Sequence, residues 1–302
     1  AQKLSDIHDG DHVIVPNITF IATLNAITYT GATPILVDAD PETWQLDINL
    51  LEDFLENNTY LVESCIGVNS TINVHYIRTH KPIKAIMPVL VLGNMCDMDR
   101  LIQLAAKYHL TVIEYCTKSL GRFFESKHSG SFGRFGVFSF NGNKIISTGG
   151  GGVIVTDNEN LPKKAKHLMT QAKSRAMEYI HDEISYNYHL INILAAVDVG
   201  RMDMFPECLS RKHAMDANYR QELKGIGEIV FLEVSPVLLL IAGSLHSRTS
   251  RMRELLEYLN KSGIISRPFW MPMNRLQMFD KLDCITDQDN SDAIYQTVLS
   301  IP

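Results

Sequence analysis

The sequence has few of the features that define disulfide-stabilised, metal-binding or membrane-spanning proteins. It contains five cysteines, an odd number with neither a C-x-x-C pair nor the ligand spacing of a zinc site: Cys65, Cys96, Cys116, Cys208 and Cys284. Scattered cysteines of this kind are typical of reduced thiols in a cytoplasmic protein. No apolar run approaches the roughly 18 residues that a membrane-spanning helix needs. We therefore expect a soluble, cytoplasmic protein with no disulfide framework and no metal site.

Positive charge is also scarce. Lys and Arg number 28 against 34 for Asp and Glu, which gives a formal net charge of -6. A protein that binds nucleic acid through a broad positive field needs the opposite balance. The first residues, AQKLSDIHDGDHV, lack the basic and apolar regions of a signal peptide. These absences exclude bulk electrostatic binding of nucleic acid and predict an unsecreted protein.

The chain does have enough apolar residues for a full hydrophobic core. It is 45% hydrophobic and 21% charged over 302 residues, a length that predicts roughly two domains. It begins with Ala1 rather than Met and stops at Pro302. We expect both ends to be truncated.

Short β-branched runs alternate with helical segments in the first half of the chain. The expected strands cover residues 12–15, 35–37, 83–92, 110–114, 136–140 and 152–156. Asp97 is the expected N-cap of a helix with one apolar face, formed by Met98, Leu101, Ile102 and Ala105. Alternation of this kind predicts βαβ units, an α/β fold and a mostly parallel sheet of at least six strands.

The pattern changes after Asn158. Helical segments are expected at residues 161–176 and 192–204, followed by apolar runs at 229–232 and 237–241. A further helix ends before Gly263, which suits the residue after a helix C-terminus. We therefore predict a large domain at residues 1–226 and a small C-terminal α+β domain at residues 227–302.

The segment SFNGNKIISTGGGG, residues 139–152, is the most specific motif in the chain. A strand ends in a polar loop that presents Lys144, and four glycines lead into the next strand. Glycines allow positive φ and close approach of the backbone to a ligand. A lysine amine removed from bulk water loses proton affinity and can form a Schiff base. The alternative is an ordinary hairpin with a solvated lysine, and a phosphate-binding glycine loop is a poorer match to the glycine spacing.

This motif resembles the lysine loop of the DegT/StrS family of nucleotide-sugar aminotransferases, which depend on pyridoxal phosphate (PLP). Four further blocks match that family in order: residues 10–47, VIEYCTKSLG at 112–121, HDEISYNYHLIN at 181–192 and SRPFW at 266–270. The match is closest to the branch that aminates 4-keto-6-deoxy UDP-sugars. The resemblance implies a large domain of the aspartate-aminotransferase type, fold type I, with a mostly parallel sheet.

The resemblance also implies roles for individual residues. Lys144 would hold PLP through a Schiff base and then move a proton between the substrate and the cofactor. Ser139 would bind the cofactor phosphate, and Phe20 would stack on the pyridine ring. Asn187 would reach the phosphate of the neighbouring subunit, which makes a homodimer the minimal active form. Without the family argument, Phe20 is a core aromatic and Asn187 is a loop residue between two tyrosines.

Two positions in the implied cofactor site depart from the family. The Asp that pairs with the pyridine nitrogen is replaced by Tyr115, a phenol that is neutral at pH 7. Glu114 precedes it on a strand and should face the other way, because successive side chains alternate. The next residue expected to face the cofactor, usually Gln, His or Glu, is Lys118. A more positive pocket should lower the pKa of Lys144 further.

Other family positions differ as well, and none of them adds an acid: Leu90, Arg134 and His189 stand where the family has His, Asp and Arg. The family's leading segment, which carries part of the phosphate site, and its closing segment after residue 302 are absent from this sequence.

Acidic clusters at HDGDH (8–12) and TDQDNSD (286–292) are more typical of turns than of metal sites. Cys116 is interpreted as a small buried residue rather than a nucleophile.

The leading hypothesis is a PLP enzyme that transfers an amino group from glutamate to a nucleotide-linked 4-keto-6-deoxy sugar. Such a product would supply the synthesis of cell-surface polysaccharides or glycans. The alternative hypothesis is a truncated homologue that keeps the fold with little catalysis and acts as a binding or partner subunit.

Overall fold

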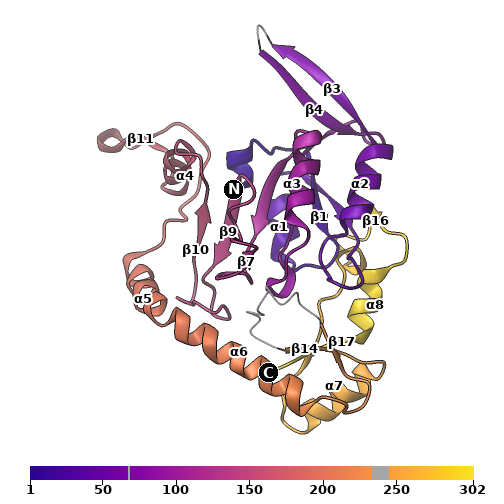
Figure 1. The fold of residues 1–302 in the computed structure, drawn as a ribbon. Helices are drawn as coiled ribbons and strands as arrows, with labels where there is room; N and C mark the ends of the chain where they lie inside the picture. Colours follow the sequence, from indigo (N-terminus) through magenta and orange to yellow (C-terminus); the bar gives the residue numbers. More distant parts are fainter. Residues whose placement is uncertain (67–68, 233–244) are drawn as a thin grey trace.

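A computed structural model describes residues 1–66, 69–232 and 245–302. A nine-stranded sheet forms its centre (Figure 1), with the strand order β10-β9-β6-β5-β1-β2-β16 and with β4 and β3 attached beyond β5. The strands are β1 His12–Pro16, β2 Thr33–Val37, β3 Thr59–Ile66, β4 Asn69–Tyr76, β5 Pro82–Ile86, β6 Thr111–Tyr115, β9 Phe135–Ser139, β10 Gly152–Val155 and β16 Cys284–Ile285. The predicted α/β fold and the sheet of at least six strands are confirmed.

The central part of the sheet is parallel. β1 pairs in parallel with β2 and β5, and β6 pairs in parallel with β5 and β9. β10 is antiparallel to β9. Antiparallel β3 and β4 form a hairpin that projects beyond the rest of the sheet in Figure 1. The carboxyl ends of β6 and β9 therefore meet at one edge of the sheet.

Each face of the sheet packs against its own helices. On β1, Val13 and Val15 belong to one hydrophobic cluster and Ile14 to the other, because side chains alternate along a strand. The first cluster includes residues of α1 (Ala22–Thr28) and α4 (Leu161–Met169). The second includes residues of α2 (Ile48–Asn57) and α3 (Met98–Lys107). The sheet is thus the middle layer of three.

The predicted helix after Asp97 is confirmed as α3. The Asp97 carboxylate accepts a hydrogen bond from the backbone N–H of Arg100, which satisfies one of the free donors at the helix start. The helix before Gly263 is α7, Met252–Lys261, and Gly263 takes a positive φ of 81° after it. Caps and apolar periodicity therefore fixed these two helices correctly.

Two expected elements are shorter than predicted. The helix expected at 161–176 ends at Met169, because Gln171 and Ala172 both take positive φ. The chain then forms the small strands β11 Lys173–Arg175 and β12 Ile180–His181 with the 3-10 turn Ala176–Glu178 between them. The strand expected at 83–92 ends at Ile86, shortly before Pro88, and is followed by a 3-10 turn at Val91–Gly93. Proline and left-handed residues override the apolar pattern in both places.

Two helices lie at the periphery of the molecule, α5 Asn192–Asp203 and α6 Phe205–Glu222. The run expected at 192–204 is thus helical almost throughout. Neither helix contains a buried residue. In Figure 1, α6 extends along the outer edge of the molecule from α5 toward α7.

The last part of the chain contains a four-stranded antiparallel sheet in the order β13-β14-β17-β15. Its strands are β13 Val230–Phe231, β14 Leu245–Arg248, β17 Val298–Ile301 and β15 Arg267–Pro268. The apolar run at 229–232 is thus confirmed in part, and the run at 237–241 lies outside the described residues.

β16 and α8 (Asn290–Thr297) return to the large sheet, where Asp38 accepts hydrogen bonds from the backbone of Asn290 and Ser291. No described helix is long and apolar enough to cross a membrane.

Candidate cofactor site

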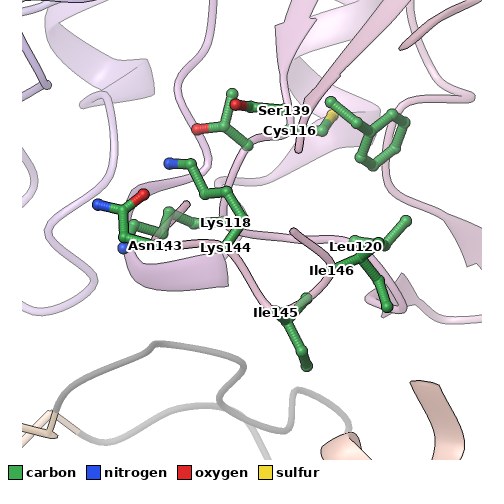
Figure 2. Close-up of a pocket in the computed structure, with 10 residues that line it drawn as sticks. Cys116, Lys118, Leu120, Ser139, Asn143, Lys144, Ile145 and Ile146 are labelled. Atoms are coloured by element: carbon green, nitrogen blue, oxygen red, sulfur yellow. The ribbon is translucent and has the colours of Figure 1, made fainter. Parts of the chain in front are cut away.

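A pocket lies beyond the carboxyl ends of β6 and β9. Because these strands run parallel and side by side, the residues that follow Tyr115 on β6 come close to Ser139 at the end of β9. The pocket is lined by Cys116, Thr117, Lys118, Leu120, Phe138, Ser139, Asn143, Lys144, Ile145 and Ile146. In Figure 2, Lys118, Lys144 and Asn143 lie on one side and Leu120 and Ile146 on the other. Ligands of open α/β sheets bind at this edge.

The loop that carries Lys144 is held by backbone hydrogen bonds. The Lys144 N–H donates to the Asn141 carbonyl at 2.9 Å, and the Thr148 N–H donates to the Phe140 carbonyl at 3.0 Å. Gly151 has φ of 86°, and a Cβ there would lie 2.6 Å from Leu190 Cδ1. A Cβ on Gly152 would lie 2.4 Å from the Phe138 carbonyl oxygen. Gly151 and Gly152 are thus required for the path of the backbone, and Lys144 sits on an ordered turn.

The Lys144 amine is half-buried and electrostatically perturbed. Its pKa is lowered to about 8, first by desolvation and then by the positive charge of Lys118. Desolvation disfavours the charged ammonium, and a neighbouring cation acts in the same direction. A substantial fraction of this amine is therefore neutral, and nucleophilic, near physiological pH.

Lys118 and Ser139 join Lys144 in this pocket. Burial, and then the charge of Lys212 on α6, lower the pKa of Lys118. The Ser139 hydroxyl oxygen accepts a hydrogen bond from the Asn141 N–H at 3.3 Å. Burial raises the pKa of the Cys116 thiol well above 9, so this thiol is not a nucleophile at neutral pH.

Glu114 and Tyr115 face opposite sides of β6, as their positions on a strand predict. The buried Glu114 carboxylate accepts hydrogen bonds from the N–H groups of Gly130, Phe132 and Gly133, each at 2.7 Å. Burial raises the pKa of the Tyr115 phenol, while the hydroxyls of Thr117 and Thr23 act in the opposite direction. Tyr115 therefore stays neutral at pH 7, next to the pocket-lining Thr117.

The structure does not bring Phe20 and Asn187 into the set of residues that line this pocket. Phe20 precedes α1, is 52% exposed, and its ring centroid lies 6.2 Å from that of Trp270. Its carbonyl accepts the N–H of Thr23, the residue that reaches Tyr115. Asn187 is exposed, and its segment is held beside the end of α4 by a bridge to Thr170.

Sequence reasoning missed several residues at or beside the pocket. Asn143 and Ile146 lie inside the lysine motif and could have been found from it. Thr23 is distant in sequence, and no local signal indicates its contact with Tyr115. Arg122 follows the pocket residue Leu120 closely and is only 2% exposed. Its Nε donates to the Gly93 carbonyl at 2.6 Å, and both terminal nitrogens are buried with no hydrogen-bond partner among the described residues.

The sequence pattern of the DegT/DnrJ/EryC1/StrS aminotransferase family matches residues 1–302. The chain belongs to this family. Its enzymes are PLP-dependent sugar aminotransferases, so the resemblance inferred from the motifs is confirmed. The α/β architecture described above is thus that of a fold-type I aminotransferase.

Known relatives cover most of the chain. It is 34% identical over 276 residues to GDP-perosamine synthase of Escherichia coli O157:H7, covering 91% of this chain and 69% of that protein. It is 33% identical over 198 residues to the UDP-N-acetyl-3-dehydro-α-D-glucosamine 3-aminotransferase of Acidithiobacillus ferrooxidans, covering 65% and 47%. A crystal structure of a family member from Brucella abortus superposes with a TM-score of 0.86 at 21% identity, covering 100% of this chain and 76% of that one.

The donor groups of the pocket fit PLP. PLP is an aldehyde with an anionic phosphate, and the pocket offers a partly neutral amine at Lys144, a hydroxyl at Ser139 and a second cation at Lys118. No carboxylate is among the described lining residues to repel the phosphate.

Proposed function

We propose that this protein is a PLP-dependent aminotransferase that moves an amino group from glutamate to a nucleotide-linked 4-keto-6-deoxy sugar. The observation that carries the proposal is the Lys144 amine, perturbed to a pKa of about 8 in a pocket at the ends of β6 and β9. Catalytic lysines of this kind are activated by desolvation and by neighbouring cations. The aminated sugar would supply cell-surface polysaccharide or glycan synthesis.

Each residue has a defined task in this proposal. Lys144 Nζ would hold the cofactor covalently and would afterwards accept and return the proton that leaves the reacting carbon. Ser139 would bind the phosphate, and Phe20 would cover one face of the ring. Tyr115 would share a neutral hydrogen bond with the ring nitrogen, and Lys118 lies in the same pocket as Lys144. When bound, the cofactor withdraws electrons from that carbon and so makes its proton removable.

The pocket favours an anionic substrate. Its described lining residues include two lysines, Lys118 and Lys144, and no carboxylate. The positive charge of Lys212 on α6 also acts on Lys118. A nucleotide-linked sugar carries a diphosphate, which such a field attracts. The relatives named above include enzymes of GDP-linked and UDP-linked sugars. These properties support a nucleotide sugar as the acceptor, with GDP and UDP as the bases to test first.

We also propose that the active form is a homodimer. Residues 177–204 expose many large apolar side chains, including Ile184 at 88%, Ile193 at 75% and Val199 at 69%. Monomers rarely leave a surface of this kind in water. The same segment carries Asn187, which would reach the phosphate bound by the partner subunit. In this arrangement residues 1–226 form the cofactor-binding domain and residues 227–302 the small domain.

The described cysteines support a reducing, cytoplasmic location. Cys96, Cys116, Cys208 and Cys284 are all free thiols, which is the usual state of cysteines in that compartment. A cytoplasmic enzyme would also meet glutamate and nucleotide sugars directly.

The test is an absorbance spectrum of the purified protein with added PLP. We expect a yellow protein whose colour bleaches with glutamate and returns with a GDP- or UDP-linked 4-keto-6-deoxy sugar, with the amino sugar detected by mass spectrometry. Lys144→Ala should remove the colour, whereas Lys163→Ala, an exposed lysine on α4, should keep it. A colourless wild-type protein would overturn the proposal and favour the alternative of a non-catalytic homologue.

A further inference from the structure

Two amines share one small pocket. Lys118 follows β6 and Lys144 follows β9, and both line the same space, where Figure 2 shows them on one side. Two ammonium groups that are partly removed from water repel one another, so the pocket favours a state in which one of them is neutral. Lys144 is the more strongly affected, with a pKa lowered to about 8.

The other charged groups around the two lysines add positive charge and no anion. Burial, and then the charge of Lys212 on α6, lower the pKa of Lys118 as well. The remaining titratable neighbours are neutral at pH 7, since burial raises the pKa of both the Cys116 thiol and the Tyr115 phenol. Glu114 is turned to the opposite face of β6, where three N–H groups bind its carboxylate. Among the residues that line the pocket, no anion offsets the charge of Lys118.

We propose that Lys118 is a positioning residue that keeps the Lys144 amine neutral, and therefore nucleophilic, at physiological pH. The proposal rests on the assignment of Lys144 as the covalent cofactor lysine, and it adds a role for the lysine that stands where the family pattern has Gln, His or Glu. Lys118 acts through its charge and takes no part in bond formation.

The chemical consequence follows from the bond that Lys144 forms. The lone pair of neutral Nζ attacks an aldehyde carbon, a C=N bond forms, and the aldehyde oxygen leaves as water with the two amine protons. A protonated amine has no lone pair for this attack. Below the midpoint of the titration, an increase of one unit in the pKa of Lys144 removes about nine tenths of the neutral amine. A fixed cation beside Lys144 thus speeds loading with the cofactor.

The experiment measures the proton affinity of Lys144 in the ligand-free protein. Trace acetylation with acetic anhydride modifies neutral amines, and peptide mass spectrometry gives the extent of labelling at each lysine as the pH is raised. We expect a midpoint near 8 for Lys144 and an upward move of about one pH unit in Lys118→Gln, because a neighbouring positive charge is lost. Lys118→Arg should retain the wild-type midpoint, since it retains the charge.

A second variant separates charge from loss of structure. Lys212→Gln removes a cation that acts on Lys118, so Lys118 holds its proton more firmly. The midpoint of Lys144 should then stay the same or fall, whereas a loosened pocket would raise it toward the ordinary value of 10.5. Lys163→Gln, exposed on α4, should change nothing. An unchanged Lys144 midpoint in folded Lys118→Gln, or an equal rise in Lys118→Arg, would overturn the proposal. The readout needs neither PLP nor activity, so its failure is distinguishable from failure of the proposed function.

Discussion

The sheet body, residues 12–156, and the arm, residues 177–222, handle apolar side chains in opposite ways. All five residues of β1 are buried, and the two faces of the sheet are covered by separate helices. In the arm, α5 and α6 contain no buried residue, although Ile193, Val199 and Met202 are apolar and at least 46% exposed. The body buries the apolar side chains of its central strands and leaves its edge strand β10 exposed, whereas the arm presents a surface that needs a partner.

The residues of the predicted cofactor site are divided between the body and the arm. Lys118, Ser139 and Lys144 all belong to the body, where the ends of β6 and β9 fix their positions. Asn187 belongs to the arm and is exposed to solvent. On this account the body supplies the chemistry and the arm of a second copy completes the phosphate site.

Removing the Glu114 carboxylate should damage the body most. Glu114→Leu leaves the buried N–H of Gly130 and the part-buried N–H groups of Phe132 and Gly133 without this acceptor. A buried donor without an acceptor costs about 1–3 kcal/mol, so we expect urea denaturation to show a loss of at least about 1 kcal/mol. Glu114→Gln keeps one oxygen acceptor and should lose less. A Glu114→Leu protein as stable as the wild type would contradict the assignment of this carboxylate to the core.

A charge in the arm should dissociate the dimer without unfolding the body. Ile193→Asp places a carboxylate in the first turn of α5, a position that a helix tolerates well. We expect sedimentation velocity to show a dimer dissociation constant raised about tenfold or more. Tyr258→Asp, at an exposed site of α7 outside the arm, is the matched control and should remain dimeric. Equal effects of both substitutions would argue against the arm as the interface.

Arg122 is the exception within the well-packed body. The residue is 2% exposed, and its two terminal nitrogens have no hydrogen-bond partner in the described part of the chain. Replacing a buried ion pair with apolar side chains of similar volume is often neutral or stabilising by about 1–4 kcal/mol, and the guanidinium of Arg122 donates only to the Gly93 carbonyl among the described residues. We therefore expect Arg122→Met to raise the urea midpoint or leave it unchanged. A loss of stability would show that the guanidinium is paired in solution.

The smallest effect concerns Lys144 and pH. Its folded pKa of about 8 lies below the ordinary 10.5, so the unfolded chain binds more protons between these values and wild-type stability rises with pH there. Below pH 8 the burial penalty of the ammonium is fully present. Lys144→Met should therefore stabilise the ligand-free protein by on the order of 1 kcal/mol at pH 7, given solvent screening, and the advantage should vanish toward pH 10.5. Urea denaturation at both pH values measures this difference; an advantage independent of pH would contradict it.

The sequence predicted most of the body because its strands are apolar runs with clear boundaries. Asp97 and Gly263 identified helix ends through local chemistry that the structure retains. The hairpin of β3 and β4 was not predicted. The helix at 161–176 was predicted too long, since positive φ at Gln171 and Ala172 is not encoded in apolar periodicity.

The sequence also predicted part of the candidate site. Lys144, Ser139 and Lys118 were found from motifs, and the structure gathers them around one pocket. The contact of Thr23 with Tyr115 joins residues about ninety positions apart and depends on how α1 packs near the end of β6. The burial of Arg122 was also missed, because burial of one long polar side chain is a property of the fold and not of its neighbours in sequence.

The most direct test of a site shared between two copies is complementation between two inactive variants. Lys144→Ala and Asn187→Ala are purified separately, mixed, dissociated and reassociated, and the PLP retained after dialysis is measured by absorbance. A mixed dimer contains one site with both Lys144 and Asn187, so about a quarter of all sites should regain wild-type retention. Retention no higher than the mean of the two parent variants would contradict a site completed by the partner subunit.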